Sequence, residues 1–242
     1  MAHNQLNKNY IVVFDMDETL GHFEQLNIFW QGLQNYNNNR LEDRDLFKLI
    51  DIFHNFLRPN IFYILNYLKT KKQETRCDKI IIYSNNLNKE WLKQIKSYLD
   101  YKLEYNLFDQ VIAGFKLNNE IIEPCRTSYN KSLKDLINCA KLSRDVNICF
   151  IDDVFHSQMN HDNVVYIQIR PYVYSIPFNK MILKYYTKTT NKIKNKKDFI
   201  DKMTLYVDRY DYEIKIKSSR ETKIDEILSK KIIHYLEEFF ET

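Results

Sequence analysis

Residues 10–20 have the sequence YIVVFDMDETL, in which a run of apolar, largely β-branched side chains ends abruptly in acids. Such a run predicts a buried β-strand over Tyr10–Phe14. Asp15 and Asp17 lie two residues apart just beyond the strand end, so both side chains are expected to point into the same crevice. Two neighbouring carboxylates repel each other unless a cation binds between them, and Mg²⁺ prefers oxygen ligands. The segment therefore predicts a strand that presents two acids for metal binding or catalysis.

Further apolar runs along the chain have the same character. They are Lys79–Tyr83, Gln110–Ala113, Asn147–Ile151 and Val164–Ile169. Between them lie segments whose apolar residues recur at helical spacing. Their apolar faces are Ile61, Phe62, Leu65 and Leu68, then Trp91, Leu92, Ile95 and Leu99, and finally Leu133, Leu136, Ile137 and Ala140. Strands that alternate with helices predict an α/β fold, with a mainly parallel sheet covered by helices on both faces. Functional side chains in such folds gather at the carboxyl ends of the strands.

Residues 21–57 interrupt this alternation directly after the first strand. Helical patterns occur around Phe29–Leu33 and Leu46–Leu57, and the Asn-rich segment Asn35–Arg40 separates them. We interpret this region as a small helical insertion over the edge of the sheet where the active site is expected.

Residues 180–242 follow the last predicted strand and combine Lys-rich connectors with helical patterns. We therefore divide the chain into a catalytic domain over residues 1–179 and a C-terminal helical extension over residues 180–242, packed on the core. One apolar stripe indicates a long helix in this extension. It consists of Ile224, Ile227, Leu228, Ile232, Leu236 and Phe239.

The overall composition indicates a folded protein, because 44% of the 242 residues are apolar and 14% are aromatic. The formal net charge of +4 does not indicate a nucleic-acid binder, so nucleic acid is a possible partner that we do not favour. Only three glycines occur, which argues against a Gly-rich phosphate loop.

The first ten residues lack the apolar stretch of a signal peptide, and no apolar run approaches the ~18 residues that span a bilayer. We expect a soluble intracellular protein, cytoplasmic or nuclear, without a membrane partner.

The four cysteines are Cys77, Cys125, Cys139 and Cys149. They form no C-x-x-C pair, and their spacing suits neither a zinc site nor a disulfide framework. We expect buried free thiols, as in a reducing compartment.

Three further segments carry polar residues where the site is expected. The strand predicted around Ile80–Tyr83 ends in Ser84, which could bind a ligand or cap the helix that follows. Lys131 and Lys134 lie near the start of a helix. The strand predicted around Asn147–Ile151 ends in the paired acids Asp152 and Asp153.

In this order, these segments resemble the four motifs of the haloacid dehalogenase (HAD) superfamily. FDMDETL at residues 14–20 is similar to the first motif. The resemblance implies a Rossmann-like core in which Asp15 is the nucleophile and a ligand of Mg²⁺. It implies that Asp17 is the general acid and base and contributes its backbone carbonyl to the metal. Thr19 would orient the loop.

The other motifs imply further roles for the residues that match them. Ser84 and Asn85, after the second strand, would bind the phosphoryl group of the substrate. Asp152 would bind the metal directly, and Asp153 directly or through water.

The lysine of the third motif has two candidates, Lys131 and Lys134. A fixed ammonium there would offset the charge of the phosphoryl oxygens and the acids. We prefer Lys134, because Lys134-Asp135-Leu136 resembles the K-D-L string of phosphatases that act on the RNA polymerase II C-terminal domain. Lys131 remains the alternative.

The same phosphatases, the NLI-interacting-factor-like branch, carry an R-P element similar to Arg58-Pro59. The resemblance implies a magnesium-dependent phosphomonoesterase that acts through an aspartyl-phosphate, with phosphoserine or phosphothreonine in protein as the expected substrate. The helical character of residues 21–57 departs from the strand-rich insertion of that branch, which puts its Ser-Pro pocket in doubt.

Only 46 residues separate Ser84 from Lys131, too few for a large cap, so an open site that accepts phosphate on a macromolecule is favoured.

Two alternatives to a protein phosphatase stay open. A nucleotide or polynucleotide-end phosphatase is the first alternative, because a basic stretch follows the last strand, although a solvated linker is its simpler explanation. That stretch contains Lys180, Lys184, Lys188, Lys192, Lys194, Lys196 and Lys197. A low-activity binding or scaffold module is the second.

Overall fold

The computed structural model describes residues 9–190 and 193–241, and its centre is a five-stranded sheet. The strands are β1 (Asn9–Phe14), β2 (Lys79–Tyr83), β3 (Gln110–Ile112), β6 (Val146–Asp152) and β7 (Val164–Gln168). They lie in the order β3-β2-β1-β6-β7, and every neighbouring pair is parallel. The predicted α/β class and parallel sheet are therefore confirmed, and each predicted strand matches an observed one within about two residues at either end.

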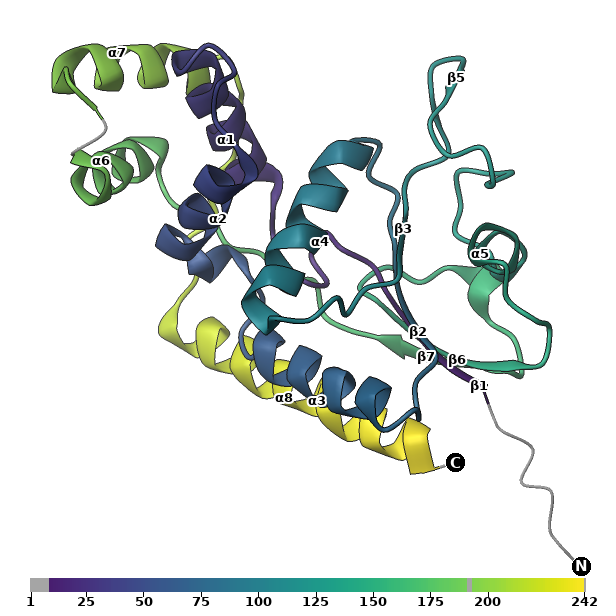
Figure 1. Cartoon of the computed structure of the whole chain (residues 1–242). Coiled ribbons are helices and arrows are strands. Elements are labelled where there is room, and N and C mark those ends of the chain that lie inside the picture. The colour runs from purple at the N-terminus through teal and green to yellow at the C-terminus, as the bar shows by residue number, and fades with distance from the viewer. Residues whose placement is uncertain (1–8, 191–192, 242) are drawn as a thin grey trace, which may run out of the picture.

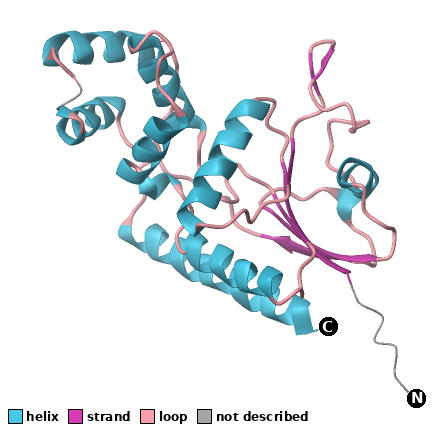
Figure 2. Ribbon diagram, viewed as in Figure 1, coloured by secondary structure: helices cyan, strands magenta, loops and turns pink. Residues whose placement is uncertain are grey.

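The central strand β1 is buried on both faces, as its uninterrupted apolar sequence predicts. Val12 and Phe14 belong to one hydrophobic cluster, whereas Ile11 and Val13 belong to a second cluster on the opposite face. Helices α3 (Ile61–Gln73) and α4 (Lys89–Leu103) contribute to the first cluster, and α5 (Leu133–Ala140) contributes to the second. Figures 1 and 2 show the sheet between these helices.

The predicted insertion is helical, with α1 (Glu24–Tyr36), α2 (Asp43–Ile52) and the short 3₁₀ helix η1 (His54–Phe56). Helices α6 (Phe178–Lys188) and α7 (Lys196–Val207) pack against it rather than against the sheet. The ring of Phe29 lies 5.8 Å from that of Tyr185, and the ring of Tyr36 lies 5.1 Å from that of Phe199. Helices α1, α2, α6 and α7 thus form one helical lobe beside the sheet (Figure 1).

The long last helix, α8 (Ser219–Glu241), lies along α3 on the core (Figure 1). Three members of the predicted stripe, Ile232, Leu236 and Phe239, are buried, but Ile227 is 57% exposed, so its assignment to the buried face was wrong. The buried face begins instead with the polar residues Asp225 and Ser229, which a search for apolar periodicity passes over. Among the described residues, none of the helices combines the length and apolar character needed to cross a bilayer.

The chain also contains a short antiparallel hairpin, β4 (Lys116–Leu117) with β5 (Glu120–Ile121). It follows β3 and projects from the sheet in Figure 1. Together with α4 and β3, it accounts for the regular structure between Ser84 and Lys131. Residues 84–131, all of which the structure describes, therefore contain no cap domain.

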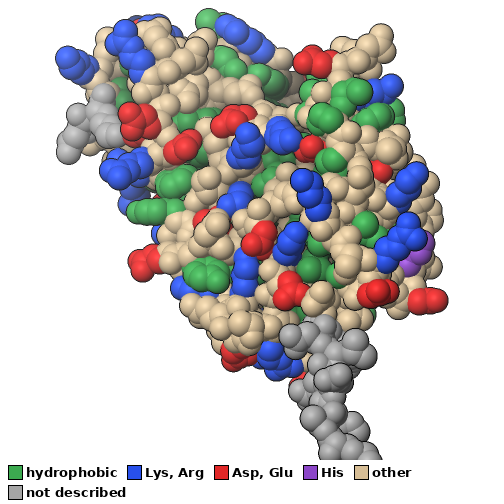
Figure 3. Space-filling view, turned by 45° about the vertical axis from the view of Figure 1, so that its right-hand side comes forward, with side chains coloured by type: hydrophobic (Ala, Val, Ile, Leu, Met, Phe, Trp, Pro, Cys, Tyr) green, Lys and Arg blue, Asp and Glu red, His purple; other side chains and the backbone are tan. Residues whose placement is uncertain are grey.

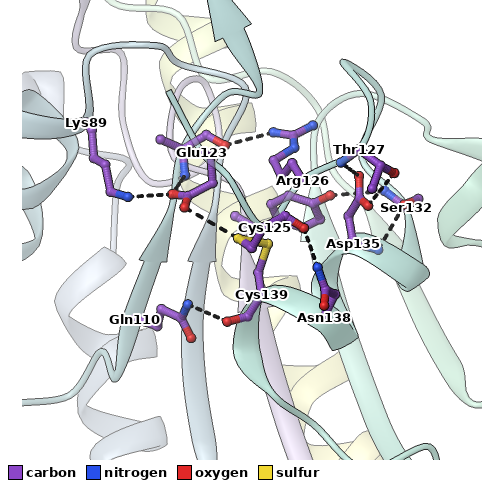
Figure 4. Close-up of a disulfide and its surroundings, with 12 residues drawn as sticks. Lys89, Gln110, Glu123, Cys125, Arg126, Thr127, Ser132, Asp135, Asn138 and Cys139 are labelled. Carbon is purple, nitrogen blue, oxygen red and sulfur yellow. Dashed lines mark hydrogen bonds and ion pairs between the residues drawn. A yellow bond between two sulfur atoms is a disulfide. The ribbon is translucent and has the colours of Figure 1, made fainter. Parts of the chain in front are cut away.

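Two of the four cysteines are not free thiols, contrary to our prediction. Cys125 and Cys139 form a disulfide with their Cα atoms 5.0 Å apart (Figure 4). The loop after the hairpin folds back over α5, where the side chain of Asn138 donates a hydrogen bond of 2.6 Å to the Cys125 carbonyl. This tertiary approach brings together two cysteines whose sequence spacing carries no recognisable pattern. Cys77 and Cys149 are buried and free, as predicted.

We expect the double variant Cys125→Ser, Cys139→Ser to unfold with a free energy about 3 kcal/mol lower than that of the oxidised protein. Cross-links that close loops of this length restrict the unfolded chain by about that amount. Urea unfolding followed by circular dichroism measures the difference. Dithiothreitol should destabilise the parent protein and leave the double variant unchanged; equal midpoints for the parent with and without the reductant would contradict the disulfide.

Candidate active site

The carboxyl edge of the sheet brings together residues that are far apart in the sequence. Phe14 of β1 pairs with Ile82 of β2 on one side and with Ile151 of β6 on the other. The residues that follow, Asp15 and Asp152, therefore lie side by side. The backbone amide of Asp15 donates to the Ile151 carbonyl over 2.9 Å, which extends the pairing of the two strands to the acid itself.

Three carboxylates converge at this edge. Asp15, Asp152 and Asp153 each present one oxygen, and these oxygens all lie within 4.8 Å of one another. Asp15 and Asp152 are almost fully inaccessible to solvent. Three of the four predicted metal ligands are therefore close enough to share one cation.

Lys131 completes the cluster, and Lys134 does not. The buried ammonium of Lys131 donates to Oδ1 of Asp15 and, over 2.7 Å, to Oδ2 of Asp152. Lys131 directly precedes Ser132, the N-cap of α5, so its side chain enters the crevice before the helix begins. Lys134 is in the first turn on the exposed side of α5. The preference for Lys134 is thus corrected to Lys131.

Asp17 lies beside the three acids and has a separate partner. Its Oδ2 accepts a hydrogen bond of 2.9 Å from the side-chain amide of Asn86. The sequence predicted Asn85 as a ligand-binding residue and overlooked Asn86. Thr19 donates its hydroxyl to Asp153 over 3.2 Å, so it fixes an acid of the cluster and thereby orients the loop.

Arg58 holds the loop that follows β1 through hydrogen bonds to its backbone. Its guanidinium donates to the carbonyls of Thr19 over 2.5 Å and Glu18 over 2.6 Å, and it is buried. Glu18 adopts a left-handed conformation with φ of 56°, which turns the chain after Asp17. Arg58, the arginine of the R-P element, therefore has a structural role: it fixes the segment that carries Asp15 and Asp17.

Ser84 and Asn85 are held by an arginine that sequence reasoning missed. Arg126, which is 2% exposed, donates to the carbonyls of Ser84 and Ala113 over 3.0 Å each and to Oδ1 of Asn85 over 2.9 Å. This bond fixes which side of the Asn85 amide faces Arg126, and the amide nitrogen is then the group that could donate to a ligand. A single arginine in a loop gave no sequence signal for this role. The helix α4 is capped by Asn88, so Ser84 is not its N-cap.

Burial and neighbouring charges shift the pKa values of the side chains in this cluster. Burial raises the pKa of Asp15 to about 7, and Asp152 and Asp17 add to this effect, whereas Lys131 opposes it. Burial alone would raise the pKa of Asp152, but a hydrogen bond from His156, together with the charge and the hydrogen bond of Lys131, lowers it overall. Burial would lower the pKa of Lys131, and the two carboxylates raise it instead. One ammonium thus stabilises the charge of two buried acids.

Asp17 and Asp153 are protonated more readily than ordinary carboxyls. Burial raises the pKa of Asp17 and outweighs the hydrogen bond from Asn86. Burial and the neighbouring Asp152 raise the pKa of Asp153. A carboxyl group with a raised pKa holds its proton to higher pH than usual, and such a group can donate that proton to a leaving group.

The donor set fits a magnesium ion. Oxygen donors from Asp15, Asp152 and Asp153 converge, and Mg²⁺ usually binds proteins through one or two carboxylates together with water and phosphate oxygens, so two of the three could bind it directly. When all three are ionised, the carboxylates carry more negative charge than Lys131 can neutralise. A divalent cation would remove the excess.

Comparison with known proteins identifies no relative, because no protein-family model, no curated protein and no solved structure matches this chain. The structure defines an α/β protein with a lysine–carboxylate cluster at the carboxyl edge of a parallel sheet. Its function has to be argued from that site.

Proposed function

We propose that this protein is a magnesium-dependent phosphomonoesterase of the HAD superfamily that forms an aspartyl-phosphate on Asp15. The observation that carries the proposal is the position of Lys131 between Asp15 and Asp152, with Asp153 within reach of the same cation. These residues come from the matching motifs in the chain order that the superfamily resemblance requires. A solvated acidic turn, the alternative without catalytic function, would not bury a lysine among its carboxylates.

The proposed reaction has two displacements at phosphorus. A carboxylate oxygen of Asp15 forms a bond to phosphorus while the bond to the leaving oxygen breaks, and Asp17 gives that oxygen its proton. Asp17 then takes a proton from water, whose oxygen displaces Asp15 and releases inorganic phosphate. Bound Mg²⁺ would offset the charge of the phosphate oxygens and allow the carboxylate to approach them.

Each proposed role has support in the geometry. Lys131 can hold the Asp15 carboxylate in place and neutralise a phosphoryl oxygen. The amide of Asn86 fixes the side chain of Asp17, whose raised pKa favours the protonated form that the first step needs. The hydroxyl of Ser84 and the amide nitrogen of Asn85 can donate to the remaining phosphoryl oxygens.

We expect Mg²⁺ to be required for turnover. Hydrolysis of an aryl phosphate should fall by about a hundredfold or more when the ion is chelated. Without the ion, the carboxylates repel the negatively charged phosphate, and Lys131 alone does not offset this repulsion. Phosphate release with EDTA, and after Mg²⁺ is restored, measures the effect. Ca²⁺ is a control for charge without the octahedral geometry of Mg²⁺. The proposal would be contradicted if the protein with Mg²⁺ hydrolysed none of three substrates: an aryl phosphate, phosphopeptides and phosphorylated oligonucleotides.

For the substrate, we propose phosphoserine or phosphothreonine in protein. The described segment between Ser84 and Lys131 forms α4, β3 and a small hairpin, without the separate domain that encloses small metabolites. This architecture favours phosphate on an exposed segment of a macromolecule.

A nucleotide or polynucleotide-end phosphatase is the second candidate, and the basic stretch from Lys180 is its only support. Part of that stretch serves the fold: the ammonium of Lys184 lies 5.1 Å from the ring centre of Phe53, and that of Lys196 lies 5.5 Å from Tyr186. Lys192 lies outside the described residues. Parallel assays on phosphopeptides and on 3′- or 5′-phosphorylated oligonucleotides distinguish the two substrates. Binding of beryllofluoride to Asp15 would exclude a scaffold without catalytic function.

A further inference from the structure

Two aromatic side chains and a lysine lie together at the base of the β4–β5 hairpin. The ring centres of Phe115 and Tyr129 are 5.6 Å apart, and the two rings meet nearly edge to face. The ammonium of Lys116 lies 5.7 Å from the ring centre of Phe115 and 5.8 Å from that of Tyr129. We call these three residues the aromatic cluster.

The aromatic cluster is not part of the protein core. Neither ring belongs to the two hydrophobic clusters that enclose the sheet, and Tyr129 is 57% exposed. Within the described part of the chain, Lys116 forms no ion pair with a carboxylate. Leu117 and Ile121 of the hairpin are exposed as well. Figure 3 shows hydrophobic side chains together at its upper right, where the hairpin projects.

The backbone of Tyr129 is held beside a residue that we expect to bind the phosphoryl group. Nη2 of the buried Arg126 donates to the Tyr129 carbonyl and to Oδ1 of Asn85, over 2.9 Å each. Two acceptors of one nitrogen can be no farther apart than two hydrogen-bond lengths. The disulfide at Cys125 ties the same loop to α5. Tyr129 therefore lies next to Asn85, in a segment that is anchored at two points.

The base of the hairpin lies against the same part of the site. The Gly114 amide donates to the carbonyl of Asn86 over 2.9 Å, and a Cβ atom on Gly114 would come within 2.5 Å of the Asn85 carbonyl oxygen. The side chain of Asn86 in turn binds Asp17, the proposed acid that protonates the leaving oxygen. Phe115, which follows Gly114, is therefore on the side of the crevice where the leaving group is expected.

We propose that the aromatic cluster binds an apolar side chain of the protein substrate, close in sequence to the phosphoserine or phosphothreonine. This inference rests on the proposed function and narrows its substrate to segments with such a neighbour. The leaving oxygen belongs to the phosphorylated residue, so the substrate chain extends from the leaving-group side of the crevice toward the two rings. An apolar side chain placed there covers the exposed ring of Tyr129, and the removal of this surface from water favours binding.

The position of Tyr129 limits how far the apolar residue is from the phosphorylated one. Tyr129 precedes Lys131 by two residues, a span of at most about 7 Å. An extended substrate advances roughly 3.3 Å per residue and covers that distance in about two residues. We therefore expect the selected side chain within about two residues of the phosphorylated residue.

A polypeptide suits this surface better than a polynucleotide. A nucleobase could stack on Tyr129, but a polynucleotide strand also needs cations along its phosphates. The hairpin carries Lys116 and Glu120 as its charged residues, so it offers no net positive charge. Beyond the rings it presents the aliphatic side chains of Leu117 and Ile121 instead.

The test measures binding and does not depend on turnover. The full chain with Asp15→Asn leaves bound phosphopeptides intact, and fluorescence anisotropy with Mg²⁺ measures their dissociation constants. Each peptide of alanine and glycine carries one phosphoserine and a single Phe, Leu, Glu or Ala, placed up to two residues before or after it. We expect Phe or Leu at one of these positions to bind about tenfold more tightly than Ala.

Three further variants, each added to Asp15→Asn, locate the preference on the structure. Tyr129→Ala should reduce it to about one, whereas Tyr129→Phe should keep it because the ring remains. Tyr63→Ala removes a similarly exposed tyrosine from α3 and is the matched control, which should also keep it. Each preference compares two peptides on one variant, so a general loss of affinity or of folded protein cancels.

The outcomes distinguish this inference from the proposed function. No binding, equal binding of all peptides or a preference for Glu overturns the inference even if the wild-type protein hydrolyses aryl phosphate. A preference lost in Tyr129→Ala and kept in Tyr129→Phe and Tyr63→Ala supports it even if no hydrolysis is found, and any other pattern of loss overturns it. If Tyr129→Ala weakens the binding of a phosphorylated oligonucleotide and leaves the peptide preference intact, the choice of a polypeptide is wrong.

Discussion

Asp15→Asn lowers the hydrolysis of an aryl phosphate by about 10⁴-fold or more, because the amide cannot form the phosphoenzyme and a coordinating carboxylate is lost. Removing a nucleophile costs a large factor even when every other group of the site stays in place. Initial rates of phosphate release at saturating Mg²⁺ measure the loss.

The fold should tolerate this substitution. Asparagine has the shape of aspartate, and burial raises the pKa of Asp15 to about 7, so the protein already accommodates an uncharged side chain there. Lys131 keeps its second partner, Asp152. Circular dichroism should show an unchanged thermal transition to within a few degrees. Asp201→Asn, an exposed position on α7, is the matched control and should retain full activity. Wild-type activity in Asp15→Asn would exclude Asp15 as the nucleophile.

The strands and the acids at their ends could be predicted from the sequence because the information is local. An apolar β-branched run forms a buried strand whatever surrounds it, and parallel strands bring their carboxyl ends to one edge. Asp15, Ser84 and Asp152 could therefore be assigned to one crevice from the order of the chain alone.

The partners of these residues depend on contacts between distant segments, so the sequence could not predict them. Lys131 and Lys134 differ only in their position relative to the first turn of α5, and a helix boundary predicted from sequence is uncertain by a similar number of residues. Arg126 reaches Ser84 from a loop 42 residues away. Cys125 meets Cys139 only because that loop folds back over α5. Contacts of this kind, between segments distant in the sequence, also determine which side chains pair with the acids of the site.

Lys131→Met destabilises the metal-free protein by about 3 kcal/mol, because it leaves Asp15 and Asp152 buried without their shared ammonium. Methionine fills a similar volume, so the loss reflects charge rather than a cavity. Lys134→Met removes the same group from an exposed position three residues away and should leave stability within about 0.5 kcal/mol of the parent. Urea unfolding in EDTA measures both.

Mg²⁺ should stabilise Lys131→Met more than it stabilises the parent protein. In the parent, the ammonium and the metal ion bind the same carboxylates, so part of the affinity for the ion is offset by the existing hydrogen bonds. In the variant the acids are free to bind the cation, and the ion stabilises the folded state in proportion to its affinity. Turnover should nevertheless fall by about a hundredfold, because the phosphoryl oxygens lose a fixed positive charge. A variant as stable as the parent in EDTA would show that Lys131 does not neutralise these acids, and the site would then lack the feature on which the proposed chemistry depends.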